Sequence, residues 1–164
     1  MQPDDVIAPK DSRHIARILA VQYLFSKLKS ENESFTPFEV DSLLQIIEEK
    51  KFDRKLYAKI VDGVEHQISE IDEIIVKIAP EWPIDQINPV NLAVLRCSIW
   101  EGFLGKITPP KVVINEAIEI SKALSAVNDS SFINGVLGNI YKSYNSDNIN
   151  NKSVESNDNS KRKD

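Results

Sequence analysis

Asp129, Ser130, Ser131 and Phe132 place a carboxylate, two hydroxyls and an aromatic ring at consecutive positions. Asp129 is a favoured helix N-cap, so these residues are predicted to form the first turn of the last helix. A helix N-terminus offers backbone N–H groups to phosphates, and an aromatic ring there can stack on a splayed base. Against this, the Asp129 carboxylate would compete for the same donors, and the spacing of Phe132 also fits a core position. These residue types favour ligand binding over catalysis.

The start of the first predicted helix is the most basic stretch of the folded body. It carries Lys10, Arg13, His14 and Arg17. Such a cluster is more often the solvated face of a helix than a phosphate-contacting patch. The residues alone leave both interpretations open.

The remaining polar residues form no catalytic or metal-binding pattern. His14 and His66 lie on different predicted helices without a cysteine or carboxylate array, so no metal site is predicted. Glu116 and Glu119 share a helix, where a solvated face or a salt bridge to Lys122 explains them better than acid–base chemistry. No nucleophile–base spacing and no phosphate-binding glycine loop occurs. We therefore predict neither an enzyme nor a cofactor.

Composition limits the possible partners and compartment. The chain has 164 residues, 41% of them hydrophobic, which suits one domain with a sizeable core. Its net charge of −5 gives no overall attraction for nucleic acid, so RNA binding would need a local basic patch. The single cysteine, the absence of a membrane-length apolar run and the acidic N-terminus predict a cytoplasmic protein that does not enter a membrane.

Three helices are predicted in the first half of the chain. The first is capped by Asp11 or Ser12, and the second by Thr36. The third begins at Asp53 and ends near Pro80. Its apolar residues recur in steps of four and three along its length, so it is predicted to be one long helix.

Three more helices are predicted in the second half. Asn88 caps the first, Pro110 opens the next, and Asp129 caps the last. Gly135 and Gly138 lie inside the last helix at a cost in stability, and close approach of another helix would explain them.

The predicted fold class is all-α, because no segment of strand length alternates with period two. Two three-helix bundles share a core within a single domain, residues 1–145. The N-terminal subdomain spans residues 11–80 and the C-terminal subdomain residues 84–145. The tail, residues 146–164, is rich in Asn, Ser and Lys and is predicted to be disordered, since it has too few apolar residues to order itself.

Four segments match one known family in the right order. They are residues 13–22 (RHIARILAVQ), Leu95-Arg96 with Trp100-Glu101, residues 110–119 (PKVVINEAIE) and residues 132–137 (FINGVL). Over residues 13–144 the chain resembles the NusB family of bacterial transcription antitermination factors. The resemblance implies an all-helical, non-enzymatic protein that binds boxA-type single-stranded RNA of ribosomal RNA leader transcripts. It also implies a protein partner, the small-subunit ribosomal protein NusE, within an RNA polymerase complex that resists termination.

The resemblance also implies where the two partners bind. The RNA surface of the family uses the starts of the first and last helices, which could form one groove in a folded bundle. The matching RNA-binding residues are Arg13, His14, Arg17, Gln22, Asp129, Ser131 and Phe132. The NusE surface involves the second half of the chain, where Arg96, Trp100 and Glu101 match the family motif.

The chain departs from the family pattern at its basic residues. Many relatives have a denser arginine run in the first helix. Many also carry a His-Lys pair where this chain has Ser130-Ser131. Both differences remove positive charge from the implied RNA surface, so we expect modest affinity for RNA alone and stronger binding with NusE.

Two other interpretations stay open. The weakened basic patch would suit a protein-only helical scaffold that has lost RNA binding. An accessory RNA-binding domain related to ribosomal RNA methyltransferases is a second possibility, against which the lack of a Gly-rich cofactor domain argues.

Overall fold

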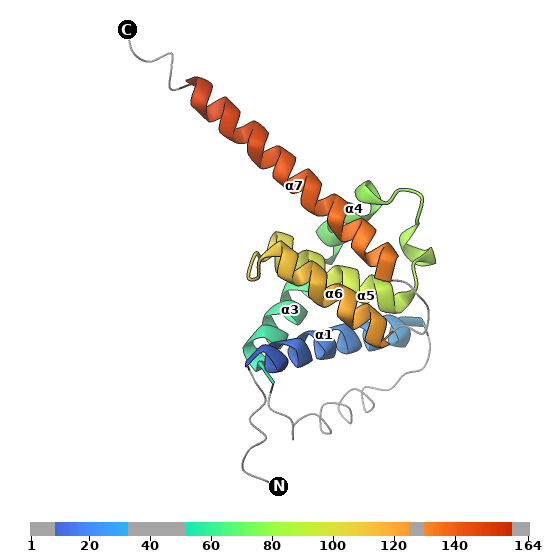
Figure 1. Cartoon of the computed structure of the whole chain (residues 1–164). Coiled ribbons are helices and arrows are strands. Elements are labelled where there is room, and N and C mark those ends of the chain that lie inside the picture. The colour runs from blue at the N-terminus through green and yellow to red at the C-terminus, as the bar shows by residue number, and fades with distance from the viewer. Residues whose placement is uncertain (1–8, 33–51, 125–129, 159–164) are drawn as a thin grey trace.

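The computed structural model describes residues 9–32, 52–124 and 130–158, and within these residues every regular element is a helix (Figure 1). The helices are α1 (Pro9–Asn32), α3 (Arg54–His66), α4 (Ile68–Ile78), α5 (Pro89–Ile99), α6 (Pro110–Leu124) and α7 (Ser130–Asp158). A short 3-10 turn, η1 (Ile84–Gln86), precedes α5, and a π-helical turn, η2 (Trp100–Leu104), follows it. The all-α prediction is confirmed. The predicted second helix and its Thr36 cap lie outside the described residues.

Local capping signals explain where several helices begin. The Asn88 side chain accepts a hydrogen bond from the Val90 N–H at 2.9 Å, with Pro89 in the first turn of α5. The Asp53 carboxylate accepts from the Leu56 N–H at 3.0 Å and caps α3. These starts are confirmed as predicted, as is the start of α6 at Pro110. Helix α1 begins at Pro9, ahead of the predicted caps.

The single long helix predicted from Asp53 to Pro80 is wrong, because the chain breaks at Gln67 between α3 and α4. The cause is a contact from a distant part of the sequence. The Trp100 indole N–H donates to Gln67 Oε1 at 2.9 Å, and its ring packs against Gly63. The break allows α4 to turn away from α3 and pack on α5 and α7. Ile68, one of the apolar residues that recur in steps of four and three in this segment, is exposed.

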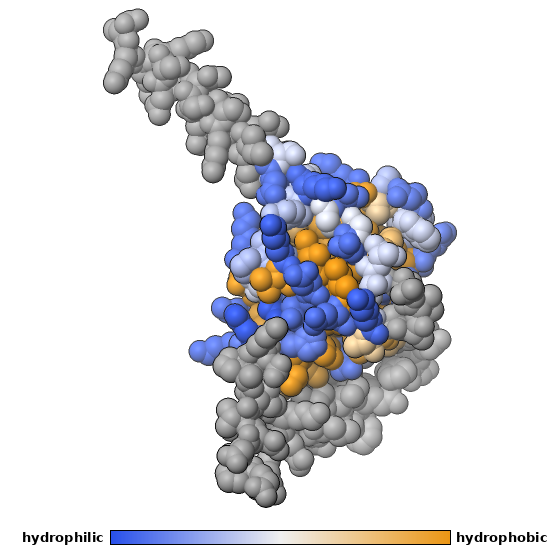
Figure 2. Space-filling view, in the orientation of Figure 1, coloured by the Kyte–Doolittle hydropathy of each residue, from blue (hydrophilic) through white to orange (hydrophobic). Residues whose placement is uncertain are grey.

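Helix α5 forms the centre of the molecule. Every residue from 91 to 99 is buried, and the helix contacts α1, α3, α4, α6 and α7. Most of the buried apolar residues form one continuous cluster to which all of these helices contribute. Figure 2 shows that the face carrying α6 is mostly hydrophilic, with hydrophobic residues gathered between the polar ones. The boundary between the two predicted subdomains stays a prediction.

The two glycines inside α7 have no packing role of the kind predicted. A Cβ atom added to Gly135 or Gly138 would meet nothing within 4 Å. An added Cβ would instead meet the Trp100 ring at Gly63 of α3 and at Gly105, which directly follows η2. The prediction for α7 was wrong because helix periodicity does not reveal which face a neighbouring helix covers.

Helix α7 continues to Asp158, whereas the sequence predicts a disordered tail from residue 146. Among the residues up to 147, whose side chains the structure describes, Tyr144 is the last that packs against the core, and Asn145, Ser146 and Asp147 are exposed. Beyond the body α7 projects outward (Figure 1). Backbone hydrogen bonds within a helix can extend it past its last packing contact, although such an extension is only marginally stable. No helix among the described residues is both long enough and apolar enough to span a membrane.

Candidate nucleic-acid interface

Arg17, one of the two arginines implied in RNA binding, lies inside the protein. It is 6% exposed, and its Nε and Nη2 atoms donate to Glu101 Oε1 at 2.9 and 2.8 Å. The Thr108 hydroxyl donates to the same carboxylate oxygen at 2.8 Å. The guanidinium therefore joins α1 to η2 and is turned away from any external phosphate. We propose that Arg17 positions helices and does not contact RNA.

Arg13 lies one helical turn before Arg17 and is oriented toward solvent. Its side chain is 53% exposed, and its Nε atom lies 3.9 Å from Asp53 Oδ2. An ion pair at this distance and exposure contributes little to stability, so the charge of Arg13 is accessible to a phosphate. Of the two arginines, only Arg13 has the exposure that an RNA contact needs.

His14 lies between these arginines and faces α6. Its Nδ1 atom is 2.6 Å from Glu116 Oε2, and Arg17 Nη1 is 3.5 Å from the same oxygen. The interpretation of Glu116 as a solvated residue, or as a partner of Lys122, is therefore wrong. Glu119, one turn further along α6, is exposed as expected.

An aromatic pair marks the start of α7. The rings of Phe132 and Trp82 meet edge to face, with centroids 5.7 Å apart and planes inclined at 66°. Trp82 is 49% exposed, while Phe132 is half-buried and also packs on the core. Phe132 thus has both a core contact and a solvent-facing side, which fits both interpretations offered by its spacing. The pair presents aromatic surface on which a base could stack.

The other implied RNA residues are less informative. Ser131 is exposed beside Phe132, and Gln22 is half-buried on α1. Asp129 lies outside the described residues.

The starts of α1 and α7 do not form one compact groove. In Figure 1, α1 begins at the left of the body and α7 begins at its right. Helix α6 packs against α7, and its Glu116 contacts α1 through His14. A ligand that contacts both helix starts must therefore extend across the body, as an unpaired strand of nucleic acid can.

The three residues implied in NusE binding all make bonds within the chain. Arg96 donates from Nε and Nη2 to the two carboxylate oxygens of Asp72, each at 2.9 Å, which ties α5 to α4. Glu101 is 2% exposed and accepts from Arg17, and Trp100 donates to Gln67 as described above. Arg96 and Glu101 are buried, so they cannot offer a partner much surface, and Trp100 is only partly exposed. We propose that Arg96 and Glu101 position the helices.

Trp82 is the candidate site residue that sequence reasoning missed. It lies between Pro80 and Pro83 in a connecting segment with no helical period, so its spacing carried no signal of a core position. A large aromatic residue in a polar, proline-bounded loop is itself a sign of a binding surface.

A family model and curated relatives match this chain over most of its length, and all of them belong to one family. Residues 14–142 match the model of the NusB family. The transcription antitermination protein NusB of Chloroflexus aggregans is 34% identical over 141 residues, covering 80% of this chain and 88% of that protein. That of Clostridium botulinum is 39% identical over 134 residues, covering 80% of this chain and 98% of that protein.

Solved structures are similar over the same part of the chain. NusB of T. maritima superposes with a TM-score of 0.63 at 27% identity, covering 79% of this chain and 90% of that one. A chain from the crystal structure of the antitermination factors NusB and NusE in complex with dsRNA gives a TM-score of 0.64 at 28% identity. That match covers 82% of this chain and 98% of the other.

Proposed function

The chain belongs to the NusB family, and from this membership we infer that it is a transcription antitermination factor that binds RNA together with NusE. The family consists of RNA-binding antitermination factors that are not catalysts. We propose further that its RNA is the single-stranded boxA type of ribosomal RNA leader transcripts. The complex with NusE then joins the RNA polymerase antitermination assembly in the cytoplasm.

The observation that carries this proposal is the solvent-facing aromatic pair of Trp82 and Phe132 at the start of α7. Unpaired bases can stack on such rings, whereas bases inside a duplex are stacked on one another. The exposed guanidinium of Arg13 supplies a separate phosphate contact at the start of α1. Because these two features lie apart, they fit an extended strand better than a compact ligand.

The buried position of Arg17 bears on affinity. Each phosphate that a protein neutralises on a single strand contributes roughly −0.7 to the slope of log K against log salt. With Arg17 held by Glu101, the start of α1 has one phosphate contact fewer than the resemblance implies. We therefore propose that binding to RNA alone is modest, with a shallow salt dependence, and that NusE strengthens it.

The test is a titration of fluorescent RNA with the full chain at two salt concentrations, with and without NusE. The RNAs are a boxA-like single strand, a scrambled strand and a duplex of the boxA-like sequence. We expect the boxA-like strand to bind most tightly, and NusE to increase its affinity. Equal binding of all three RNAs under every condition would reject the single-stranded, sequence-specific proposal.

The aromatic pair is tested by Trp82→Ala and Phe132→Ala, with His66→Ala on the exposed end of α3 as the matched control. Loss of a stacked base costs about 1–3 kcal/mol, so each aromatic variant should bind RNA at least several-fold more weakly than the control. Unfolding by urea must be measured in parallel, because Phe132 also contacts the core. If Phe132→Ala loses stability but keeps RNA affinity, the ring serves the core alone.

The burial of Arg17 also favours one alternative, a protein-only scaffold. The same titrations separate the two functions. A chain that binds NusE but no RNA, even in the presence of NusE, would be such a scaffold.

A further inference from the structure

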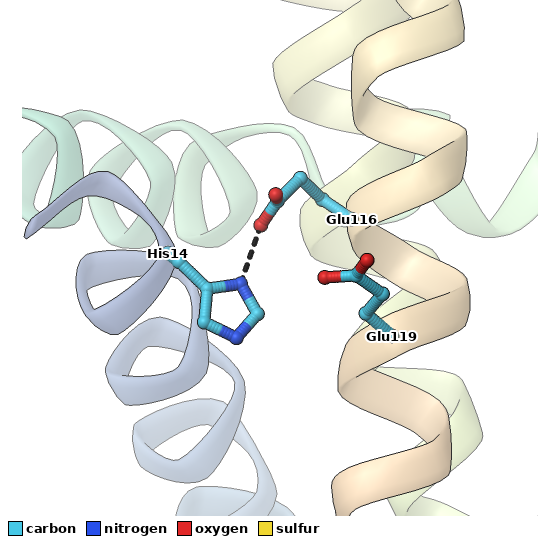
Figure 3. A group of neighbouring side chains, drawn as sticks. All are labelled: His14, Glu116 and Glu119. Carbon is cyan, nitrogen blue, oxygen red and sulfur yellow. Dashed lines mark hydrogen bonds and ion pairs between the residues drawn. The ribbon is translucent and has the colours of Figure 1, made fainter. Parts of the chain in front are cut away.

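His14, Glu116 and Glu119 form a compact group of side chains, of which the family resemblance assigns only His14 to RNA binding. Figure 3 shows the imidazole of His14, from α1, facing the two carboxylates of α6 across the space between the helices. One potential ligand atom from each residue lies within 4.8 Å of the others. From this geometry we propose that the group binds a divalent transition-metal ion, with Zn²⁺ as the preferred ion.

The chemistry of the three ligands selects the class of ion. One imidazole nitrogen with two carboxylate oxygens suits Zn²⁺ and its first-row neighbours, whereas Mg²⁺ and Ca²⁺ prefer oxygen ligands. Three protein ligands leave a fourth tetrahedral position for water. Cys97, the one thiol of the chain, is buried in α5, and burial raises its pKa, so it does not compete as a ligand.

The arrangement needs only a small adjustment to bind the ion. Ligand atoms about 2.0–2.2 Å from a tetrahedral Zn²⁺ lie roughly 3.4 Å apart. His14 Nδ1 and Glu116 Oε2 are already 2.6 Å apart in a hydrogen bond, and the ion would take the place of that bond. The imidazole would then hold its proton on Nε2. Glu119 is exposed, so its side chain can rotate inward to complete the site.

The local charge also favours a cation. Arg17 is a positive group in contact with the site, with Nη1 3.5 Å from Glu116 Oε2. Its charge is already matched by Glu101, which accepts two of its hydrogen bonds through Oε1. Counting His14 as neutral, the one positive charge of Arg17 faces the three negative charges of Glu101, Glu116 and Glu119, which leaves a local charge of −2.

The test is calorimetric titration of the chelator-treated full chain with Zn²⁺, and with Mg²⁺ in parallel. We expect one Zn²⁺ per chain and no saturable binding of Mg²⁺. His14→Ala and Glu119→Gln should each weaken Zn²⁺ binding by roughly tenfold or more, as loss of groups around a metal typically does. His66→Ala, which removes the other histidine, should leave the affinity unchanged. Glu119 is exposed, so Glu119→Gln tests the site without disturbing the hydrogen bond between His14 and Glu116.

A second measurement locates the ion. The chain has two histidines, so its imidazole NMR signals are few, and Zn²⁺ should shift those of His14 and not those of His66. Zn²⁺ binding that is insensitive to both His14→Ala and Glu119→Gln would overturn the proposal, as would the absence of saturable binding. Neither measurement depends on RNA binding, so the proposed metal site and the proposed RNA function can be rejected independently of each other.

Discussion

Arg13 and Arg17 lie one helical turn apart in α1, but the Arg13 side chain is exposed and the Arg17 side chain is buried. Arg13 reaches solvent with a weak ion pair, whereas Arg17 is enclosed by Glu101, Glu116 and η2. Removing one member of a buried ion pair destabilises the fold, because the other charge is left without a partner in a medium of low dielectric. We therefore propose that Arg17 contributes mainly to folding and Arg13 mainly to RNA binding.

Arg17→Met should lower the free energy of unfolding by about 3–5 kcal/mol, because Glu101 is left buried without its cation. Urea denaturation measures this loss. Arg13→Met is the matched control, which should change stability by no more than about 0.5 kcal/mol while weakening RNA binding. If instead Arg17→Met keeps its stability and loses RNA affinity, our proposal for Arg17 is wrong.

Tyr57 gives a pH-dependent signal of folding. Burial, together with the nearby Tyr23 and Glu65, raises its pKa to about 12 from 10.0. Because the folded state favours the neutral phenol, the stability that it contributes is present below pH 10 and declines as the pH rises toward about 12. Tyr57→Phe should remove a late step from the alkaline absorbance titration. Loss of an early step instead would show that Tyr57 titrates as an exposed phenol.

At the scale of elements, the junction of α5 and η2 determines how the helices are arranged. Along this junction Arg96 bonds to α4, Trp100 to the α3–α4 break and Glu101 to α1. The π-helical turn changes the direction in which Trp100 and Glu101 project relative to Arg96. These residues match the family motif, and their observed contacts give them a structural role.

The contact between Gly63 and the Trp100 ring predicts that Gly63→Ala lowers the stability of the protein. A Cβ at position 63 would lie 1.9 Å from the Trp100 ring, so Gly63→Ala must displace the indole and its bond to Gln67. We expect a loss of about 1–3 kcal/mol, measured by urea denaturation. Gly135→Ala in α7 is the control, since its Cβ meets open space and should stabilise the helix by up to about 1 kcal/mol. Equal effects of the two changes would contradict this account.

At the scale of the whole molecule, α5 holds the two halves of the chain around one core, and α7 leaves that core after Tyr144. The ring of Tyr144 packs on Phe103 with centroids 5.3 Å apart. The next three residues are exposed. The stability of the body should therefore depend on the chain up to Tyr144 and little on the residues after it.

Deleting residues 148–164 should leave the thermal unfolding midpoint unchanged. Deleting residues 144–164 also removes the Phe103–Tyr144 contact, and should lower stability by about 1 kcal/mol or more. Thermal melts followed by circular dichroism compare the two. A large loss from the shorter deletion would show that the end of α7 packs on the body.

The sequence by itself determined the helical fold class and several helix starts, because these depend on residues close together in the chain. Asn88 with Pro89 and Asp53 act through bonds to residues two or three positions away. The resemblance to the family could also be recognised from the sequence, because each of its motifs is a short run of neighbouring residues. The match to the family model confirms it.

Only the tertiary structure decided which of these residues face solvent. The break at Gln67 depends on Trp100, 33 positions away, and the burial of Arg17 depends on Glu101, 84 positions away. The group of His14 with Glu116 spans 102 positions. Helical periodicity states which residues share a face of their own helix, but not which helix covers that face. For that physical reason the sequence could not show that Arg17 and Arg96, which match contact residues of the family, bond to Glu101 and Asp72 inside the fold.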